Sequence, residues 1–70
     1  MNEREFISEN LIRQIKYSRK TGAQIARELE IDPSTIFHYL NGNALPTIEK
    51  IRRLCEILGC TYEDIFGKIN

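Results

Sequence analysis

Helix-capping and helix-breaking residues recur at short intervals along this chain, and this punctuation limits its fold more than any other feature. Between the breaks, apolar residues recur three or four positions apart, which is the spacing of one face of an α-helix. No segment alternates apolar and polar residues with the period of two that marks a β-strand. The sequence therefore predicts an all-α protein of five short helices. The breaks lie at Thr21-Gly22, Asp32-Pro33, Asn41-Gly42-Asn43, Pro46-Thr47, Gly59 and Thr61.

The cap residues place the helix boundaries. We expect helices at about residues 3–19, 22–29, 33–40, 47–58 and 62–67. Thr21 and Gln24 fit a capping box, in which each side chain satisfies a free backbone N–H group. Pro33 suits the first position of the third helix, because the N–H group that it lacks would have no partner there. Gly42 and Gly59 end the third and fourth helices, since glycine adopts the left-handed C-cap conformation at little cost.

Each predicted helix carries an apolar stripe that contributes to the core. The core of a 70-residue chain is thin, because a chain of about this length buries only about 60% of the surface that it exposes when unfolded. We therefore expect a single domain over residues 1–70. The predicted inward-facing residues are Ile7, Leu11, Ile15 and Ser18 in the first helix, Ile25, Ala26 and Leu29 in the second, Ile36, Tyr39 and Leu40 in the third, and Ile48, Ile51, Leu54, Cys55 and Leu58 in the fourth.

Composition argues against several classes of function. Ten Lys and Arg residues balance ten Asp and Glu residues, and 41% of the chain is hydrophobic, which is ordinary for a globular domain. No apolar run is long enough to span a membrane, and the first residues form no apolar signal segment, so we expect a cytoplasmic protein. The spacing of Cys55 and Cys60 fits neither a redox motif nor a zinc site, so we expect reduced thiols and no metal or cofactor. We expect no enzyme and no small-molecule substrate, because His38, Glu28 and Ser34 lie on short helices without a deep cleft.

Only three residues, Glu30-Ile31-Asp32, separate the second and third predicted helices. Two short helices joined by so tight a turn cross at a large angle. Ala26 is small at the expected crossing point, Ile31 is an apolar plug in the turn, and Ile36 points back toward the second helix. This pattern predicts a helix-turn-helix, a motif whose second helix lies in the major groove of DNA.

The stretch GAQIARELEIDPSTI, residues 22–36, resembles the helix-turn-helix of the Cro/C1-type repressor family, also called the XRE family. The stretch LCEILGCTYEDIF, residues 54–66, resembles the end of the family's fourth helix and its short fifth helix. The similarity covers about residues 8–67 and implies a compact, lambda-repressor-like bundle of five helices. It also implies sequence-specific binding to double-stranded DNA by a transcriptional regulator of the repressor type. Further matching positions are Ile25-Ala26, Ile31, Ile36, Asn41-Gly42 and Pro46.

The resemblance also implies which residues contact DNA. The recognition helix, residues 33–40, would present Pro33, Ser34, Phe37 and His38 to base edges. Family members pair through the fifth helix, so we expect a homodimer on a pseudo-palindromic operator with half-sites about one DNA turn apart. The implied phosphate contacts are Lys20, Thr21, Gly22, Arg27, Thr35, Asn41, Gly42, Asn43 and Thr47. The implied dimer interface is Tyr62, Ile65, Phe66 and Ile69.

Three residues depart from the family pattern and leave a second function open. Gly22 stands where the family often has a DNA-contacting Gln, Pro33 occupies a common base-reading position, and Leu40 replaces a frequent Glu. The net charge of zero, Pro33 and the aromatic Phe37 favour as the alternative a protein-interaction module of the same fold, antirepressor-like or antitoxin-like. Binding that weakens steeply with salt would indicate DNA rather than an apolar protein partner.

The distribution of charge supports DNA binding more than the total charge does. Five basic residues and no acidic one lie between Asn10 and Arg27, and a second basic cluster follows in the fourth helix. We therefore expect one basic face. The alternative interpretation of these charges is a solvated helix surface. The alternative for Phe37 is a core or interface residue, and the alternative for Ile65 and Phe66 is that they close the core. The two clusters are Arg13, Lys16, Arg19, Lys20 and Arg27, and Lys50, Arg52 and Arg53.

Overall fold

The computed structural model describes residues 2–68. This part of the chain contains five α-helices and no strand. The prediction of an all-α protein with five helices is confirmed. The observed bounds differ from the expected ones by one residue at the end of the first helix, the start of the fourth and the end of the fifth. The helices are α1 (Glu3–Ser18), α2 (Gly22–Leu29), α3 (Pro33–Leu40), α4 (Ile48–Leu58) and α5 (Tyr62–Phe66).

Every helix begins after a side chain that caps its free N–H groups. Thr21 forms the predicted capping box, because its Oγ1 accepts from the Gln24 N–H at 3.1 Å and Gln24 Oε1 accepts from the Thr21 N–H at 2.8 Å. Thr61 and Asp64 form a second capping box at α5. Asp32 caps α3. Local sequence therefore fixes these helix starts. The remaining N-caps are Asn2 and Thr47.

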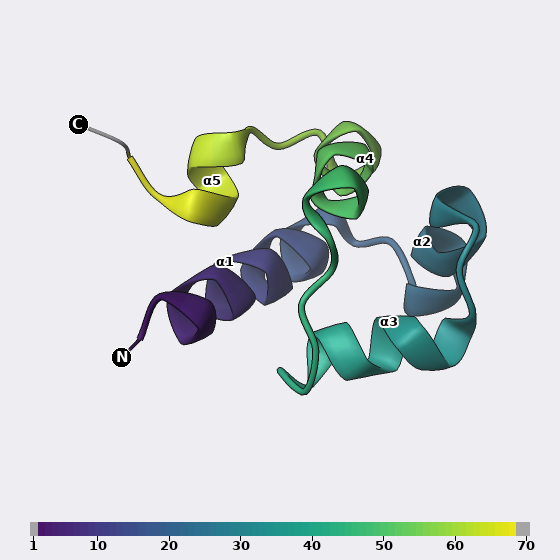
Figure 1. Cartoon of the computed structure of the whole chain (residues 1–70). Helices are drawn as coiled ribbons and strands as arrows, with labels where there is room; N and C mark the ends of the chain where they lie inside the picture. Colours follow the sequence, from purple (N-terminus) through teal and green to yellow (C-terminus); the bar gives the residue numbers. More distant parts are fainter. Residues whose placement is uncertain (1, 69–70) are drawn as a thin grey trace.

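The arrangement of the helices separates α2 and α3 from α5. The helix α1 runs through the middle of the molecule and contacts α3, α4 and α5, while α2 packs on α3 and α4 (Figure 1). The pair α2 and α3 lies at one end of the molecule, and α5 lies with the first turn of α1 at the other (Figure 1). None of the helices described is long and apolar enough to cross a membrane. The largest fully buried side chains are Leu11, Ile25, Leu29, Leu54 and Ile65.

The predicted apolar stripes supply most of the core, with one error. Ile48 was expected on the buried side of α4, but its side chain is 78% exposed. It is the first residue of α4, and the stripe reaches the core only one turn later, at Ile51. A stripe read from sequence therefore gives the face of a helix but not the point along it where burial begins.

A buried hydrogen bond fixes α5 against α1. Asn10 Nδ2 donates to the Ile65 carbonyl at 3.0 Å, and Arg13 Nη1 donates to Asn10 Oδ1 at 3.0 Å. Both ends of the buried amide are thus satisfied, as buried polar groups require. A helix of five residues is too short to be stable alone, so this contact and the burial of Ile65 hold it in place.

Cys55 and Cys60 belong to the motif that ends α4. Gly59 adopts φ 69° at the C-cap, and the Cys60 N–H donates to the Cys55 carbonyl at 3.0 Å. This is the hydrogen bond of a Schellman motif, in which the side chains at these two positions commonly pack together. Both thiols are free, with Cys55 buried and Cys60 half-buried, so they fill small apolar sites as expected. Burial, with the neighbouring Cys55, raises the pKa of the Cys60 thiol from 9.0 to about 12.

We predict that this thiol makes the protein less stable at alkaline pH. The folded state keeps the Cys60 proton at pH values where the unfolded chain, with a pKa of 9.0, has lost it. The contribution to stability is therefore fully present below about pH 9 and is lost as pH rises toward about 12. Urea unfolding under reducing conditions should show a steeper loss of unfolding free energy for wild type than for Cys60→Ala over this range. Equal pH slopes for the two proteins would contradict the assignment.

Candidate nucleic-acid interface

Backbone hydrogen bonds close the turn between α2 and α3. The Glu30 N–H donates to the Arg27 carbonyl at 3.2 Å, and the Ile31 N–H donates to the Ala26 carbonyl at 3.0 Å. Glu30 supplies the left-handed conformation that this ending needs, at φ 61°, although it is not glycine. Ile31 packs against the core as a partly buried plug, as expected. The turn thus fixes the direction in which α3 leaves α2.

Gly22 lies where α2 and α3 come closest. A Cβ atom at this position would lie 3.0 Å from Cγ2 of Ile36 and 3.9 Å from Cδ1 of Leu40. A side chain here would require the Ile36 side chain to shift. This packing accounts for the departure from the family's Gln and for the apolar Leu40 in place of a frequent Glu. Gly22 is therefore a packing residue as well as a predicted phosphate contact.

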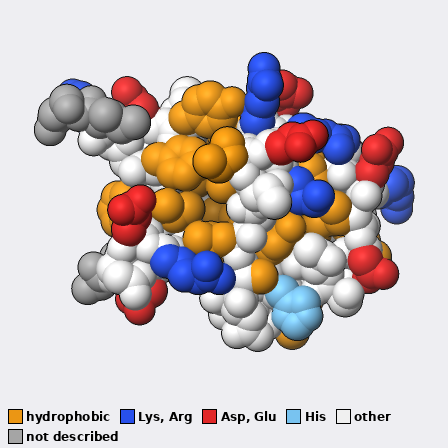
Figure 2. Space-filling view, viewed as in Figure 1, with side chains coloured by type: hydrophobic (Ala, Val, Ile, Leu, Met, Phe, Trp, Pro, Cys, Tyr) orange, Lys and Arg blue, Asp and Glu red, His pale blue; other side chains and the backbone are white. Residues whose placement is uncertain are grey.

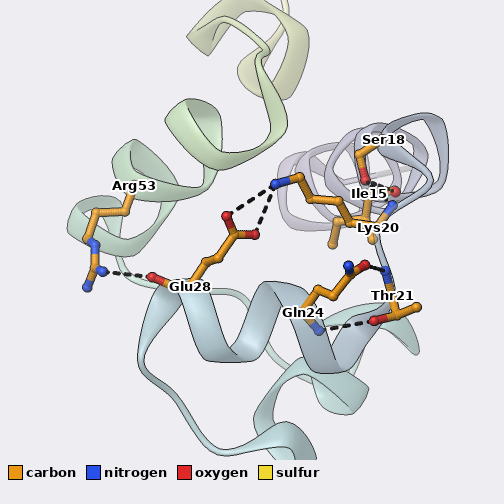
Figure 3. Close-up of polar contacts among 7 residues, drawn as sticks. All are labelled: Ile15, Ser18, Lys20, Thr21, Gln24, Glu28 and Arg53. Carbon is orange, nitrogen blue, oxygen red and sulfur yellow. Dashed lines mark hydrogen bonds and ion pairs between the residues drawn. The ribbon is translucent and has the colours of Figure 1, made fainter.

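Side-chain hydrogen bonds stabilise both ends of α2 (Figure 3). The capping box of Thr21 holds its start. At its end, Arg53 of α4 donates from Nη2 to the Glu28 carbonyl at 3.0 Å and from Nη1 to the Leu29 carbonyl at 3.2 Å. These carbonyls belong to the last turn, where acceptors lack intrahelical partners and a positive charge is favourable. Sequence reasoning placed Arg53 only in a basic cluster, because no local signal shows that it reaches α2.

Lys20, a predicted phosphate contact, forms an ion pair within the protein. Its Nζ lies 3.0 Å from Glu28 Oε2 and 3.2 Å from Glu28 Oε1 (Figure 3). Such solvent-accessible pairs contribute at most about 1 kcal/mol. A phosphate can therefore replace Glu28 as the partner of Lys20 at little cost.

The four predicted base-reading residues lie together on the open side of α3. Pro33, Ser34, Phe37 and His38 are all exposed, and their spacing of one, four and five positions places them on one helix face. Phe37 is 65% exposed, whereas Ile36 on the opposite side is only 2% exposed. The rings of Phe37 and His38 meet edge to face with centroids 6.5 Å apart. The helix is therefore anchored by one face and free on the other.

Ser34 is more constrained than sequence reasoning expected. Its N–H group and its hydroxyl both donate to Asp32 Oδ1, each at 2.8 Å. These hydrogen bonds lower the pKa of the Asp32 carboxyl below its ordinary value. Because Asp32 holds the hydroxyl proton, the Ser34 oxygen is left to accept hydrogen bonds rather than donate them.

The predicted phosphate contacts offer mostly neutral groups. The Thr21 N–H is already bound by Gln24, so the N–H groups without an intrahelical acceptor at the start of α2 are those of Gly22 and Ala23. Asn41 Oδ1 accepts from the Asn43 N–H at 3.0 Å, which shapes the loop after α3. Among the other candidates, those exposed are Arg27, Asn41, Gly42, Asn43 and Thr47, and the one partly buried is Thr35.

Charge is distributed less simply than expected. Residues 33–48 contain no Lys, Arg, Asp or Glu, so the ionisable side chains of α3 and the following loop are limited to His38 and Tyr39. Three of the basic residues, Arg13, Lys20 and Arg53, form contacts within the protein. Figure 2 shows Lys and Arg side chains interspersed with Asp and Glu on the face in view, with the histidine at the surface on the α3 side. On this face the charges are therefore mixed rather than gathered into one basic patch.

The predicted dimer residues separate into different environments. Ile65 is 0% exposed and belongs to the monomer core, so its assignment to a dimer interface was wrong. Tyr62 is 52% exposed, and its ring lies 6.4 Å from that of the half-buried Phe66. Hydrophobic side chains gather over α5 in Figure 2. Ile69 lies outside the described residues.

We predict that removing the Arg53 guanidinium loosens the helix-turn-helix. Arg53→Met keeps an unbranched apolar stem but leaves two carbonyls of α2 without a donor, so the unfolding free energy should fall by about 1–2 kcal/mol. Arg52→Met, at the exposed neighbouring position, should change it by less than about 0.5 kcal/mol. Urea denaturation measures both. Equal effects would show that the Arg53 contacts contribute nothing.

Comparison with known proteins agrees with this arrangement. Residues 11–65 match the helix-turn-helix family model HTH_3. The chain is 32% identical over 62 residues to the cryptic phage CTXphi transcriptional repressor RstR of Vibrio cholerae serotype O1 (strain ATCC 39315 / El Tor Inaba N16961), a match that covers 89% of this chain and 55% of that protein. The chain thus spans about half the length of this relative. None of the solved structures gives a significant match. The family match includes the whole of α2, the turn and α3, and the chain therefore belongs to the Cro/C1-type helix-turn-helix family of transcriptional regulators.

Proposed function

We propose that this chain binds double-stranded DNA sequence-specifically, with the open face of α3 in the major groove, and acts as a transcriptional repressor. The observation that carries the proposal is the two-sided character of α3. Ile36 and Tyr39 anchor it to the core, while Pro33, Ser34, Phe37 and His38 are exposed. Repression is proposed because the relative described above is a transcriptional repressor.

Phosphate binding would rest on backbone groups more than on cations. The free N–H groups of Gly22 and Ala23 lie at the positive end of the α2 dipole, a position that favours anions. On the other side of α3, the backbone N–H groups of Asn41 and Asn43 already donate within the protein, so their side-chain amides and the free N–H groups at the start of α4 offer the further donors. Lys20 and Arg27 would add charge from the α2 side. This division places donors before and after the reading helix, so that α3 lies between two phosphate contacts.

A homodimer is the second part of the proposal. Tyr62 and Phe66 form an aromatic pair at the surface of α5, and Tyr62 is 52% exposed. Two copies joined through α5 would read two half-sites about one DNA turn apart. Since Ile65 is buried in the core, the contact between copies would rest on Tyr62 and Phe66.

The alternative is a protein-interaction module of the same fold. The large exposed ring of Phe37 favours it, because exposed aromatic side chains are common in protein interfaces. The same ring has a natural place in the major groove, where apolar side chains contact thymine methyl groups. The effect of salt on binding separates the two functions.

A fluorescence-anisotropy titration tests DNA binding. Wild-type protein should bind a random-sequence duplex with an affinity that falls steeply with salt, by a slope of about 0.9 for each phosphate contact. Arg27→Gln should lower this slope by about one. Arg4→Gln, at the far end of α1 from α2 and α3, should leave it unchanged. The double variant Ser34→Ala/His38→Ala should keep this non-specific affinity but lose preference for a selected sequence. Absence of binding at low salt would overturn the proposal and favour the protein-interaction module.

A second titration tests the dimer. Wild type should bind a duplex with two correctly spaced half-sites at least about tenfold more tightly than a duplex with one. Tyr62→Glu should abolish this advantage, because it places a charge in the apolar contact, and should leave single-site affinity unchanged. Tyr17→Glu alters a similarly exposed tyrosine on α1 and should keep the advantage. Retention of the advantage by Tyr62→Glu would rule out pairing through α5.

A further inference from the structure

We infer that α3 selects A·T base pairs, with Phe37 contacting a thymine methyl group and Ser34 accepting from a base amino group. This inference rests on the proposed function and specifies the class of sequence that the chain would recognise. It follows from three features of the open face of α3: the position of Phe37, the bound hydroxyl proton of Ser34, and the kinds of side chain that the face contains.

The ring of Phe37 is an apolar group without a place in the protein core. It is 65% exposed, whereas Ile36 and Tyr39 on the same helix are buried. The ring of His38 contacts that of Phe37 edge to face, at a centroid distance of 6.5 Å, so both rings lie on the reading face. The major groove offers one prominent apolar group, the C5-methyl of thymine. Burial of that methyl against Phe37 would remove apolar surface from water on both partners.

Ser34 and Asp32 make the start of α3 an acceptor surface. The Ser34 hydroxyl donates to Asp32 Oδ1 at 2.8 Å, so its oxygen presents lone pairs outward. Hydrogen bonds from Ser34 also hold the pKa of the Asp32 carboxyl below its ordinary value, so the carboxylate adds acceptors and a negative charge. Guanine presents only acceptors in the major groove, at O6 and N7, whereas adenine and cytosine present amino donors. This surface therefore disfavours guanine at the base that it meets.

The rest of the reading face offers no bidentate contact to a purine, since His38 could form only a single hydrogen bond. Bidentate recognition of guanine uses Arg or Lys, and bidentate recognition of adenine uses Asn or Gln. Residues 33–40, PSTIFHYL, contain none of these four residue types. An amino donor next to a methyl group is the pattern of an A·T pair, since adenine supplies the donor and thymine the methyl. The chemistry of the face thus matches A·T better than G·C.

The test replaces thymine by uracil, which removes only the C5-methyl group. A binding sequence is first selected from a random duplex pool with wild-type protein, and each thymine is then replaced in turn. We expect at least one position where wild type loses about three- to fivefold in affinity, the worth of one buried methyl group. Phe37→Ala should lose a similar factor on the thymine duplex and show no further loss with uracil. Tyr17→Ala, which removes an exposed aromatic side chain on α1, should keep both the affinity and the sensitivity to uracil, and circular dichroism should show that both variants remain folded.

A methylation experiment gives an independent reading at the same position. Replacing the sensitive T·A pair by C·G should weaken binding, and 5-methylcytosine should restore part of the loss for wild type but not for Phe37→Ala. If selected DNA binds and no thymine shows sensitivity that depends on Phe37, the inference is wrong while the proposed function stands. If selection returns no bound DNA, the proposed function is wrong and the inference is overturned with it.

Discussion

The close approach of α2 and α3 at Gly22 and Ile36 is the contact on which the rest of the molecule depends. A Cβ atom on Gly22 would lie 3.0 Å from Cγ2 of Ile36, so a larger residue here would require the Ile36 side chain or α3 to shift. The same contact buries Ile36 and turns the opposite side of α3 to solvent. The small size of Gly22 therefore helps to set the position of the reading face.

Two short helices keep such a crossing only when other contacts stabilise them. Neither α2 nor α3 exceeds eight residues, and helices of that length gain their stability from packing. The capping box of Thr21 and the Arg53 guanidinium supply fixed points at the two ends of α2. The buried amide of Asn10 does the same for α5 through the Ile65 carbonyl. A thin core is thus supplemented by polar contacts at helix ends, where free backbone groups would otherwise remain.

Local rules in the sequence predicted the helices well because their boundaries are set locally. Thr21, Asp32 and Gly59 act at the helix ends that they themselves define. The errors and omissions concern contacts between distant segments. The family resemblance assigned Ile65 to a dimer interface, and its burial was missed because the position of α5 depends on Asn10, 55 residues away in sequence. The exposure of Ile48 was missed because helical periodicity does not show where along α4 the core begins.

The interface was predictable in its location but not in its chemistry. Family resemblance placed Pro33, Ser34, Phe37 and His38 on the reading helix, and all four are exposed. The pairing of Lys20 with Glu28 and the binding of the Ser34 proton by Asp32 depend on side-chain geometry, which no spacing rule specifies. The hydrogen bond from Arg53 to the Glu28 carbonyl joins residues 25 positions apart, and no local sequence pattern predicts it. These contacts change what the surface offers: fewer free cations and more acceptors than the residue types alone suggest.

The most direct test of the account is the footprint of DNA on the protein. An NMR titration of the ¹⁵N-labelled chain with a selected duplex, compared with a shuffled duplex of equal length, reports which backbone amides change their environment. We expect the selected duplex to shift the amides at the start of α2, in residues 34–38 and in the loop after α3 up to Thr47 most strongly, while the middle of α1 is unaffected. Large shifts confined to α1 and α5, with α3 unchanged, would contradict the placement of α3 in the groove.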